Sequence, residues 1–207
     1  MNGKTRFPGE GSLLPQRERP LLQGERIRLE PLTLDHTQGL YNRGRMAVDW
    51  MFMPRSCFID MADTRQWIEE ALDDPTQIPF AIIENAKNRV VGSTRFLHMR
   101  PEHRGVEIGW TWLGQEWQRT GVNTEAKLLL LSHAFERMGC IRVEFKTDAR
   151  NLRSQQALER IGATREGVLR NHMIVQGGYH RDSVFYSVID DEWPSVKARL
   201  QALKRRG

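Results

Sequence analysis

Residues 107–113 read Glu107-Ile108-Gly109-Trp110-Thr111-Trp112-Leu113, and a turn with the sequence Gln118-Arg119-Thr120-Gly121-Val122-Asn123 comes soon after them. The first segment is rich in β-branched and aromatic residues, which predicts a strand. The pattern beyond the turn predicts a helix over residues 124–138, a strand over 141–147 and a second helix that Asn151 opens. A strand, a glycine turn and a helix in this order direct backbone N–H groups toward an anion. This part of the chain is therefore the first candidate for a ligand site.

The composition bounds the class of protein. The chain has 207 residues, of which 39% are hydrophobic and 28% charged, as expected for a globular domain. No apolar run approaches the roughly 18 residues that a membrane span needs, and no signal-peptide core is visible, so we expect a cytoplasmic protein. Cys57 and Cys140 lie far apart and predict reduced thiols without a metal site. The net charge of +5 favours an anionic ligand, either a phosphorylated cofactor or a nucleic acid.

The remaining segments predict one domain behind a leader. Residues 1–22 hold glycine and proline among charges without hydrophobic periodicity, which predicts a flexible leader, and residues 23–207 form the domain. Strands are expected at 26–32, 80–83, 90–96, 164–173 and 183–189, and helices at 35–45, from Asp63 or Thr64 to 72, and after Asp191. This order predicts an α/β (α+β) fold, in which helices cover both faces of a mixed sheet.

The turn around Gly121 has two interpretations. A residue without Cβ lets the backbone pass close to a ligand, and the following helix offers free N–H groups and a positive dipole end. Arg119 adds a positive charge, and Thr120, Asn123 and Thr124 add side-chain hydrogen bonds. An isolated glycine turn is more often an ordinary helix entry, here with Asn123 as the N-cap. Four further features of the sequence favour the ligand site.

Those features are residues 26–32, residues 107–110, Asn151-x-x-Ser154 followed by residues 157–163, and the two segments 165–167 and 179–184. Together with the turn, and over roughly residues 22–195, they resemble the GNAT acyltransferase superfamily. Within it they resemble the RimJ/RimL-type branch of ribosomal-protein N-terminal acetyltransferases. Residues 118–123 are similar to the pyrophosphate loop of that superfamily, Gln/Arg-x-x-Gly-x-Gly/Ala. Asn123 departs from this pattern, although asparagine still supplies the backbone N–H that the loop needs.

The resemblance implies a GNAT fold with a mixed, mostly antiparallel sheet of six to seven strands, flanked by helices on both faces. It also implies acetyl-CoA or another acyl-CoA as cofactor. The pyrophosphate would lie on the N–H groups of residues 119–124, and the pantetheine arm would pair with residues 111–113 like an added strand. The implied cofactor-binding residues are Thr111, Trp112, Leu113, Gln118, Arg119, Thr120, Gly121, Val122, Asn123, Thr124, Asn151 and Ser154. No metal is implied.

Acyl transfer to an amine needs a base, donors for an oxyanion and a proton for the departing thiolate. Glu107 is the candidate base, alone or through a water; with equal weight, it is a structural carboxylate paired with an arginine. Ser154 matches the serine that the resembling branch uses near the coenzyme A sulfur, and its alternative role is to cap or pack the second helix. A backbone N–H near Leu113 would serve as the oxyanion donor.

Two positions that carry a carboxylate in similar enzymes hold Lys146 and Met173 here, and neither residue can act as a base. His172, beside Met173, is a further candidate because histidine titrates near neutral pH. A lone histidine in a strand is nevertheless more often structural. His98, His103 and His180 rank below it.

The leading hypothesis is an acyl-CoA-dependent N-acyltransferase, in the first place an N-acetyltransferase, that acts by direct transfer to a primary amine of a protein N-terminus or a small molecule. One alternative is a non-catalytic acyl-CoA-binding or regulatory protein, since two carboxylate positions are lost. Another is a transferase for a larger acyl-CoA such as succinyl-CoA. A nucleic-acid partner has only the basic charge in its favour, and no membrane partner is expected. Aromatic residues, with the irregular segment 50–58 as a lid, are expected to wall an acceptor pocket. The acceptor, the acyl length and the oligomeric state, monomer or homo-oligomer, stay open.

Overall fold

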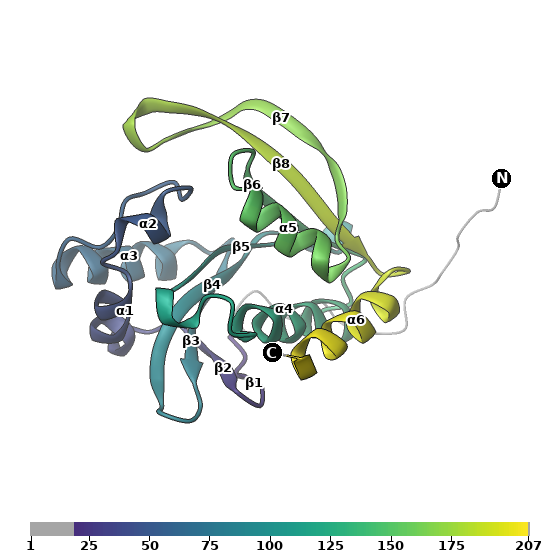
Figure 1. Cartoon of the computed structure of the whole chain (residues 1–207), viewed down its shortest axis with the longest axis horizontal. Coiled ribbons are helices and arrows are strands. Elements are labelled where there is room, and N and C mark those ends of the chain that lie inside the picture. Colours follow the sequence, from purple (N-terminus) through teal and green to yellow (C-terminus); the bar gives the residue numbers. More distant parts are fainter. Residues whose placement is uncertain (1–18, 207) are drawn as a thin grey trace.

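The computed structural model describes residues 19–206, so residues 1–18 of the expected leader fall outside the described residues. The described part contains one eight-stranded sheet in the order β1-β2-β3-β4-β5-β6-β8-β7 (Figure 1). The strands are β1 (Leu22–Gln23), β2 (Ile27–Pro31), β3 (Ile78–Glu84), β4 (Arg89–Arg100), β5 (Gly105–Leu113), β6 (Arg142–Asp148), β7 (Thr164–Val175) and β8 (Tyr179–Ile189). The predicted fold class is confirmed, with slightly more strands than the six to seven expected, and the two-residue β1 is one that the sequence pattern did not indicate.

Helices cover both faces of the sheet, as predicted. They are α1 (Thr37–Arg43), α2 (Ala47–Trp50), α3 (Met61–Asp73), α4 (Val122–Ser132), α5 (Leu152–Ile161) and α6 (Trp193–Arg206). Along β3 the side chains alternate between two cores: Phe80 and Ile82 join the core that contains α4 and α6, whereas Ala81 and Ile83 join the core that contains α1 and α3. This period of two is what a strand buried on both faces requires.

The feature that positions the site is the parting of β5 from β6. All neighbouring strands run antiparallel except these two, which are parallel and pair only through residues 105–107 of β5 and 142–144 of β6. Beyond Glu107, β5 continues to Leu113 without a partner on this side. The sheet therefore splays open next to the start of α4.

Three predicted helix starts are wrong for local reasons. The helix after the glycine turn begins at Val122 with Gly121 as its N-cap, so Asn123 lies inside the first turn and does not cap the helix. Helix α3 begins before Asp63, because the Asp60 carboxylate accepts a hydrogen bond from the Asp63 N–H at 2.8 Å. The helix expected from residue 35 is divided into a short 3₁₀ turn, Leu34–His36, and α1.

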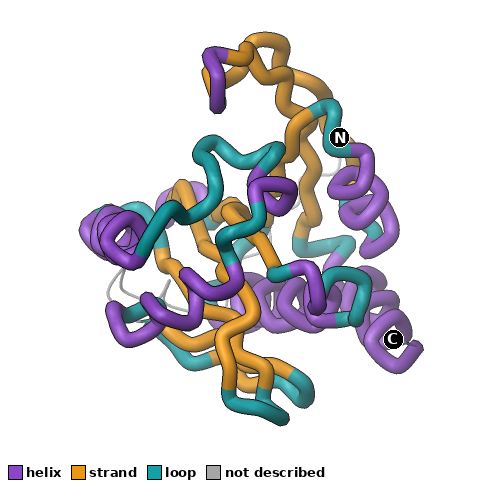
Figure 2. Tube along the Cα trace, turned by 60° about the vertical axis from the view of Figure 1, so that its left-hand side comes forward, coloured by secondary structure: helices purple, strands orange, loops and turns teal. Residues whose placement is uncertain are grey.

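The hairpin of β7 and β8 extends beyond the rest of the sheet (Figures 1 and 2). At its tip the Gln176 side-chain amide donates to the carbonyl oxygens of Trp50, Met53 and Arg55, at 2.9, 2.9 and 2.5 Å. The hairpin thus ties down the irregular segment that the sequence suggested as a lid.

Candidate active site

The splay between β5 and β6 opens into a cavity of about 1170 Å³. One end, here called the loop end, is lined by residues of 118–124 and 151–161. The other, the aromatic end, is lined by Phe52, Met53, Trp67, Arg95 and Trp110. Of the predicted cofactor-binding residues, those that line the cavity are Thr111, Trp112, Leu113, Gln118, Arg119, Gly121, Asn123, Thr124, Asn151 and Ser154. Thr120 and Val122 lie outside the lining: the Thr120 hydroxyl donates to the Trp117 carbonyl at 2.7 Å, and Val122 is part of the core.

The glycine turn has the geometry of an anion site. Gly121 has φ +82°, a left-handed conformation that glycine adopts without strain, and Arg119 also has a positive φ of 64°. The first N–H in this helix to find a backbone acceptor is that of Glu125, which donates to the Gly121 carbonyl at 3.0 Å. The N–H groups of residues 122–124 therefore remain available at the positive end of the helix. The Arg119 side chain is exposed beside them.

Glu125, in the first turn of α4, does not oppose this anion site. Its buried carboxylate accepts hydrogen bonds from the backbone N–H groups of Glu25, at 2.7 Å, and Arg26, at 3.2 Å, and pairs with Lys204 Nζ at 3.2 Å. These partners hold the turn between β1 and β2 and the end of α6 against α4. They also offset the charge of the carboxylate, which does not itself line the cavity.

Lys127, one turn further along α4, is a cavity residue that sequence reasoning missed. It is 6% exposed, its ammonium group donates to the Thr111 hydroxyl at 2.9 Å, and Nζ lies 5.4 Å from the centre of the Phe145 ring. Burial lowers the pKa of Lys127 to about 7. The signal that indicates such a residue is a single lysine on the face of a helix that is otherwise apolar.

A hydrogen-bonded chain joins the loop end to α2. Gln118 Nε2 donates to Asp49 Oδ1 at 2.6 Å and to the Leu113 carbonyl at 3.0 Å, while Gln118 Oε1 accepts from Arg153 at 2.7 Å. Burial raises the pKa of Asp49. The predicted phosphate-loop glutamine therefore links three elements around the cavity.

Glu107 lines the cavity and is 4% exposed. Its Oε2 atom lies 3.0 Å from His98 Nδ1 and 3.2 Å from Lys146 Nζ. The structural partner expected for this carboxylate was an arginine; the structure has a histidine and a lysine instead. Lys146, which replaces a carboxylate of similar enzymes, thus carries the counter-charge of the candidate base.

Ser154 lines the cavity from the first turn of α5. Its backbone N–H donates to Asn151 Oδ1 at 3.0 Å, so Asn151 caps the helix that it was predicted to open, and the alternative role of Ser154 as the cap is wrong. The Ser154 hydroxyl forms no hydrogen bond with residues 19–206. This leaves the hydroxyl available to a ligand in the cavity.

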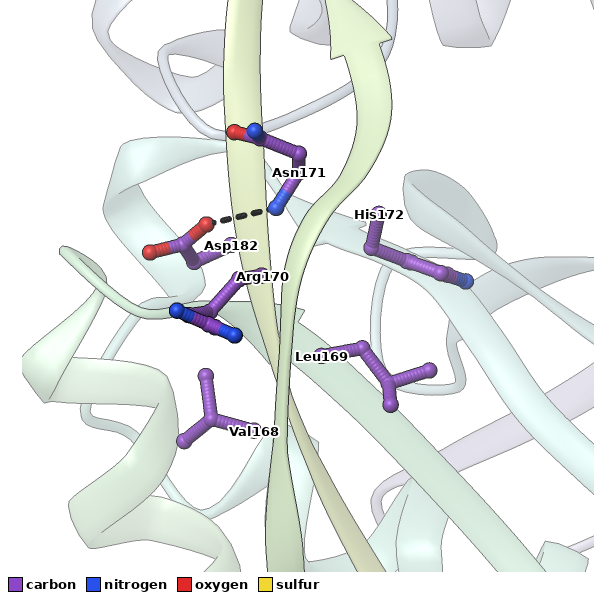
Figure 3. A pocket seen from close by; sticks show the side chains of 6 residues that line it. All are labelled: Val168, Leu169, Arg170, Asn171, His172 and Asp182. Atoms are coloured by element: carbon purple, nitrogen blue, oxygen red, sulfur yellow. Dashed lines mark hydrogen bonds between the residues drawn. The ribbon is translucent and has the colours of Figure 1, made fainter.

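His172 does not line this cavity, whereas its neighbour Met173 does. It borders a separate, more open hollow of about 910 Å³ beside the bulge in β7, together with Val168, Leu169, Arg170, Asn171 and Asp182 (Figure 3). The imidazole points away from Asp182 (Figure 3), and its Nδ1 atom lies 3.0 Å from the Ser183 hydroxyl. Burial, then Lys146, lowers the pKa of His172. His172 therefore lies outside the cavity lining, although the charges of Lys146 and Glu107, which line the cavity, act on its ring.

The aromatic end contains a second residue that the sequence did not indicate. Arg95 of β4 is 4% exposed and lies between the rings of Trp67 and Trp110, at 4.4 and 4.8 Å from their centres. Its Nη1 atom donates to Gln77 Oε1 at 3.0 Å. Trp50, by contrast, is fully buried in the core that also holds Trp112 and does not line the cavity.

Two kinds of feature are absent from the part of the chain that the structure describes. Across residues 19–206, no group of three His, Cys, Asp or Glu side chains is arranged to hold a metal ion. Within the same range, every helix is too short or too polar to cross a membrane.

Comparison with known proteins gives one family match and several similar structures. The model of the acetyltransferase (GNAT) domain matches residues 26–164. YdaF of Bacillus subtilis, provisionally named a ribosomal N-acetyltransferase, is 36% identical over 95 residues, which are 46% of this chain and 51% of YdaF. The chain thus spans about half the length of that relative.

Two solved structures agree over most of their length. A GCN5-related N-acetyltransferase from Brucella melitensis is 30% identical with a TM-score of 0.86, over 91% of this chain and 86% of that one. A provisionally named acetyltransferase from T. thermophilus is 40% identical with a TM-score of 0.82, over 88% of this chain and 95% of that one.

Proposed function

The chain belongs to the GNAT acetyltransferase family, and we propose that it transfers an acetyl group from acetyl-CoA directly to a primary amine bound at the aromatic end of the cavity. The observation that carries this proposal is the splay of β5 from β6, because it opens beside an anion-binding helix start. A long, thin thioester fits such a slot, with its phosphates at one end and its acyl group at the other.

The loop end supplies the contacts for coenzyme A. The N–H groups of residues 122–124 and the guanidinium of Arg119 are suited to the pyrophosphate, and Arg153 and Arg160 add positive charge to the same part of the lining. The free edge of β5 at residues 111–113 offers backbone hydrogen bonds to the pantetheine amides. Lys127 lies beneath that edge through its bond to Thr111.

In the proposed reaction the amine nitrogen attacks the thioester carbonyl carbon, the C–S bond breaks, and the amine proton leaves. Glu107 would accept that proton, directly or through a water. A backbone N–H near Leu113 would stabilise the oxyanion. The Ser154 hydroxyl, free of other hydrogen bonds within residues 19–206, would give a proton to the departing thiolate.

For the acceptor, the name of YdaF favours an amine of a ribosomal protein, and thus the RimJ/RimL-type branch. A small-molecule amine is the second candidate. The contacts of Glu107 Oε2 with Lys146 Nζ and His98 Nδ1 favour a different alternative, a protein that binds acyl-CoA without turning it over, because these partners already occupy the oxygen atom that would accept the proton.

The test begins with ligand binding. Thermal shifts with acetyl-CoA, succinyl-CoA and coenzyme A rank the acyl groups, since a tighter ligand stabilises the fold more by mass action. We expect acetyl-CoA to give the largest shift. A larger shift with succinyl-CoA would instead make succinyl-CoA, with its longer acyl group, the favoured donor.

Transfer is then measured against peptide N-termini and small amines. Glu107→Gln should lower kcat/KM by about 100-fold or more if Glu107 is the base. Glu144→Gln is the matched control. Glu144 lies opposite Glu107 on the neighbouring strand, forms ion pairs with Arg100 and Arg142, and lies outside the cavity. Equal rates for Glu107→Gln and the unmodified protein would reject this base. A protein that binds acetyl-CoA but acetylates no amine would support the binding alternative.

A further inference from the structure

Arg95 has hydrogen-bonding groups that the protein itself does not use. Its Nε and Nη2 atoms are buried and have no hydrogen-bond partner among residues 19–206, whereas Nη1 is bound by Gln77. Within the same range no carboxylate lies within ion-pairing distance of the guanidinium. A buried donor without a partner is destabilising, so an arginine with two of them indicates a binding role.

The position of the unpaired atoms specifies the ligand. Nε and Nη2 form the side-on edge of the guanidinium, the pair of parallel donors that fits the two oxygens of a carboxylate. Burial lowers the pKa of Arg95 to about 10, so the group is still charged at neutral pH. Its nearest acidic neighbours, Asp74 and Glu70, line the same cavity. The Asp74 carboxylate is already bound by Thr76 and by Gln77, which separates it from Arg95.

The backbone brings this arginine to the reaction site. Arg95 pairs with Gly109 across β4 and β5, and Leu97 pairs with Glu107, so Arg95 is two residues along the same face from the candidate base. That distance is roughly 7 Å along a strand. A register shift between Ser93 and Arg95 and the positive φ of Trp110, 50°, distort both strands at this level.

We propose that the acceptor carries a carboxylate as well as its amine, and that the side-on edge of Arg95, between Trp67 and Trp110, binds this carboxylate. This inference rests on the proposed acetyl transfer for the role of the amine. In the present conformation the two nitrogen atoms have no exposed surface. Because both atoms are covered, a neighbouring side chain has to shift when the carboxylate arrives, and the half-buried Trp110 indole is one such neighbour of the guanidinium.

The test first measures binding without any transfer. The probes are glycine, β-alanine, 4-aminobutanoate, 5-aminopentanoate and L-phenylalanine, each compared with its amide, with inorganic phosphate as a different anion. Trp67 and Trp110 report on the site through their fluorescence. We expect at least one acid to change the emission and to bind tenfold or more tightly than its amide. In acetylation assays the same acid should have a KM at least tenfold below that of its amide.

Variants assign the effect to the guanidinium edge. Arg95→Lys keeps the charge and removes the paired donors, so the preference for acid over amide should fall at least tenfold. Arg55→Lys is the matched control, because Arg55 also lies over aromatic rings but its edge is already bound, Nη2 by Asp63 and Nε by the Ser56 carbonyl. Acetyl-CoA affinity and the melting temperature show whether each variant is folded. Should Arg95→Lys be unfolded, Gln77→Leu, which frees Nη1 and leaves the edge intact, replaces it and should keep the preference.

Equal binding of every acid and its amide, binding of phosphate alone, or an unchanged preference in Arg95→Lys would each overturn the carboxylate assignment. Failure of the proposed function gives a different pattern. In that case acids bind in the Arg95-dependent manner while no amine is acetylated.

Discussion

At the loop end of the cavity the ligand-binding groups are backbone N–H groups that one short turn presents, whereas at the aromatic end they are side chains from α3, β4, β5 and the segment after α2. The loop end depends on a local conformation, centred on Gly121 with its φ of +82°. The aromatic end depends on contacts such as that of Gln176 with Met53, which are 123 residues apart in the sequence. If the proposed function holds, cofactor binding should therefore tolerate changes of side chain at the loop end, whereas acceptor choice should depend on tertiary packing.

Lys127, one turn further along α4 than the loop end, is a buried side chain in the same cavity, and its replacement should have the largest effect, a change in the stability of the protein. Its folded-state pKa of about 7 lies below the ordinary value of 10.5, so the unfolded chain binds more protons between pH 7 and 10.5 and stability rises with pH over that window. Below pH 7 the penalty for the buried ammonium is fully present. Lys127→Met should therefore be more stable than the unmodified protein by about 2–4 kcal/mol at pH 6, and the difference should vanish near pH 10.5.

Melting temperatures measured from pH 6 to 10.5 check this prediction. Thr111 keeps its hydrogen bond to Thr94, at 2.8 Å, when the ammonium is removed. Lys87→Met, at an exposed position in the β3–β4 turn, is the control and should show no such trend. A destabilised Lys127→Met at pH 6 would mean that the ammonium has a partner that offsets its burial.

Gly121→Val tests directly whether the loop end depends on backbone conformation. A β-branched residue is strongly disfavoured at a φ of +82°, so the turn should rearrange and acetyl-CoA should bind about 10- to 100-fold more weakly, as expected from roughly 1–3 kcal/mol of strain. Calorimetric titration measures the dissociation constant. Gly177→Val, at φ +69° with open space around it, introduces the same strain at the hairpin tip and should leave acetyl-CoA affinity unchanged.

Ser154→Ala separates binding from catalysis at the same end. The helix cap uses the backbone N–H of this residue, so α5 and the affinity for acetyl-CoA should be retained. Loss of the hydroxyl should lower kcat about tenfold if it supplies the thiolate proton. An unchanged kcat in steady-state assays, with product release shown not to limit the rate, would remove Ser154 from the mechanism.

Gln176→Ala should have the smallest effect, and only at the aromatic end. It removes three hydrogen bonds to the segment after α2, so this segment should become more mobile and the acceptor KM should rise about threefold, since each exposed bond contributes roughly 1 kcal/mol or less. Gln155→Ala, which removes a side-chain bond to the Ala149 carbonyl, is the matched control. A raised KM for acetyl-CoA in Gln176→Ala would show that the two ends are coupled.

The same division explains what could be predicted from the sequence. The glycine turn and the helix that opens at Asn151 depend on residues within a few positions of each other, and both lie where expected. The cap assigned to Asn123 was wrong because Gly121, in its left-handed conformation, already begins the helix. Boundaries of this kind depend on a single backbone angle.

The residues that escaped prediction owe their roles to distant partners. Arg95 lies between Trp67 and Trp110 with two donors unpaired among residues 19–206, and Lys146, the unexpected partner of the predicted Glu107, lies 39 positions further along the chain. Neither contact leaves a periodic pattern, since each is made by a single side chain on an otherwise ordinary strand. The role of a single charged side chain on a strand can therefore be assigned only when its neighbours in the folded protein are known.

The buried Glu125 carboxylate has a consequence for handling the protein. Its three partners, the N–H groups of Glu25 and Arg26 and the ammonium of Lys204, lie near opposite limits of the described chain. A fragment trimmed to the matched domain, residues 26–164, would lose two of these three contacts and leave a charge stranded in the first turn of α4, besides losing β8 and α6 from the sheet and core. Expression boundaries are therefore better drawn outside both of these anchor points, with a spacer between them and any affinity tag.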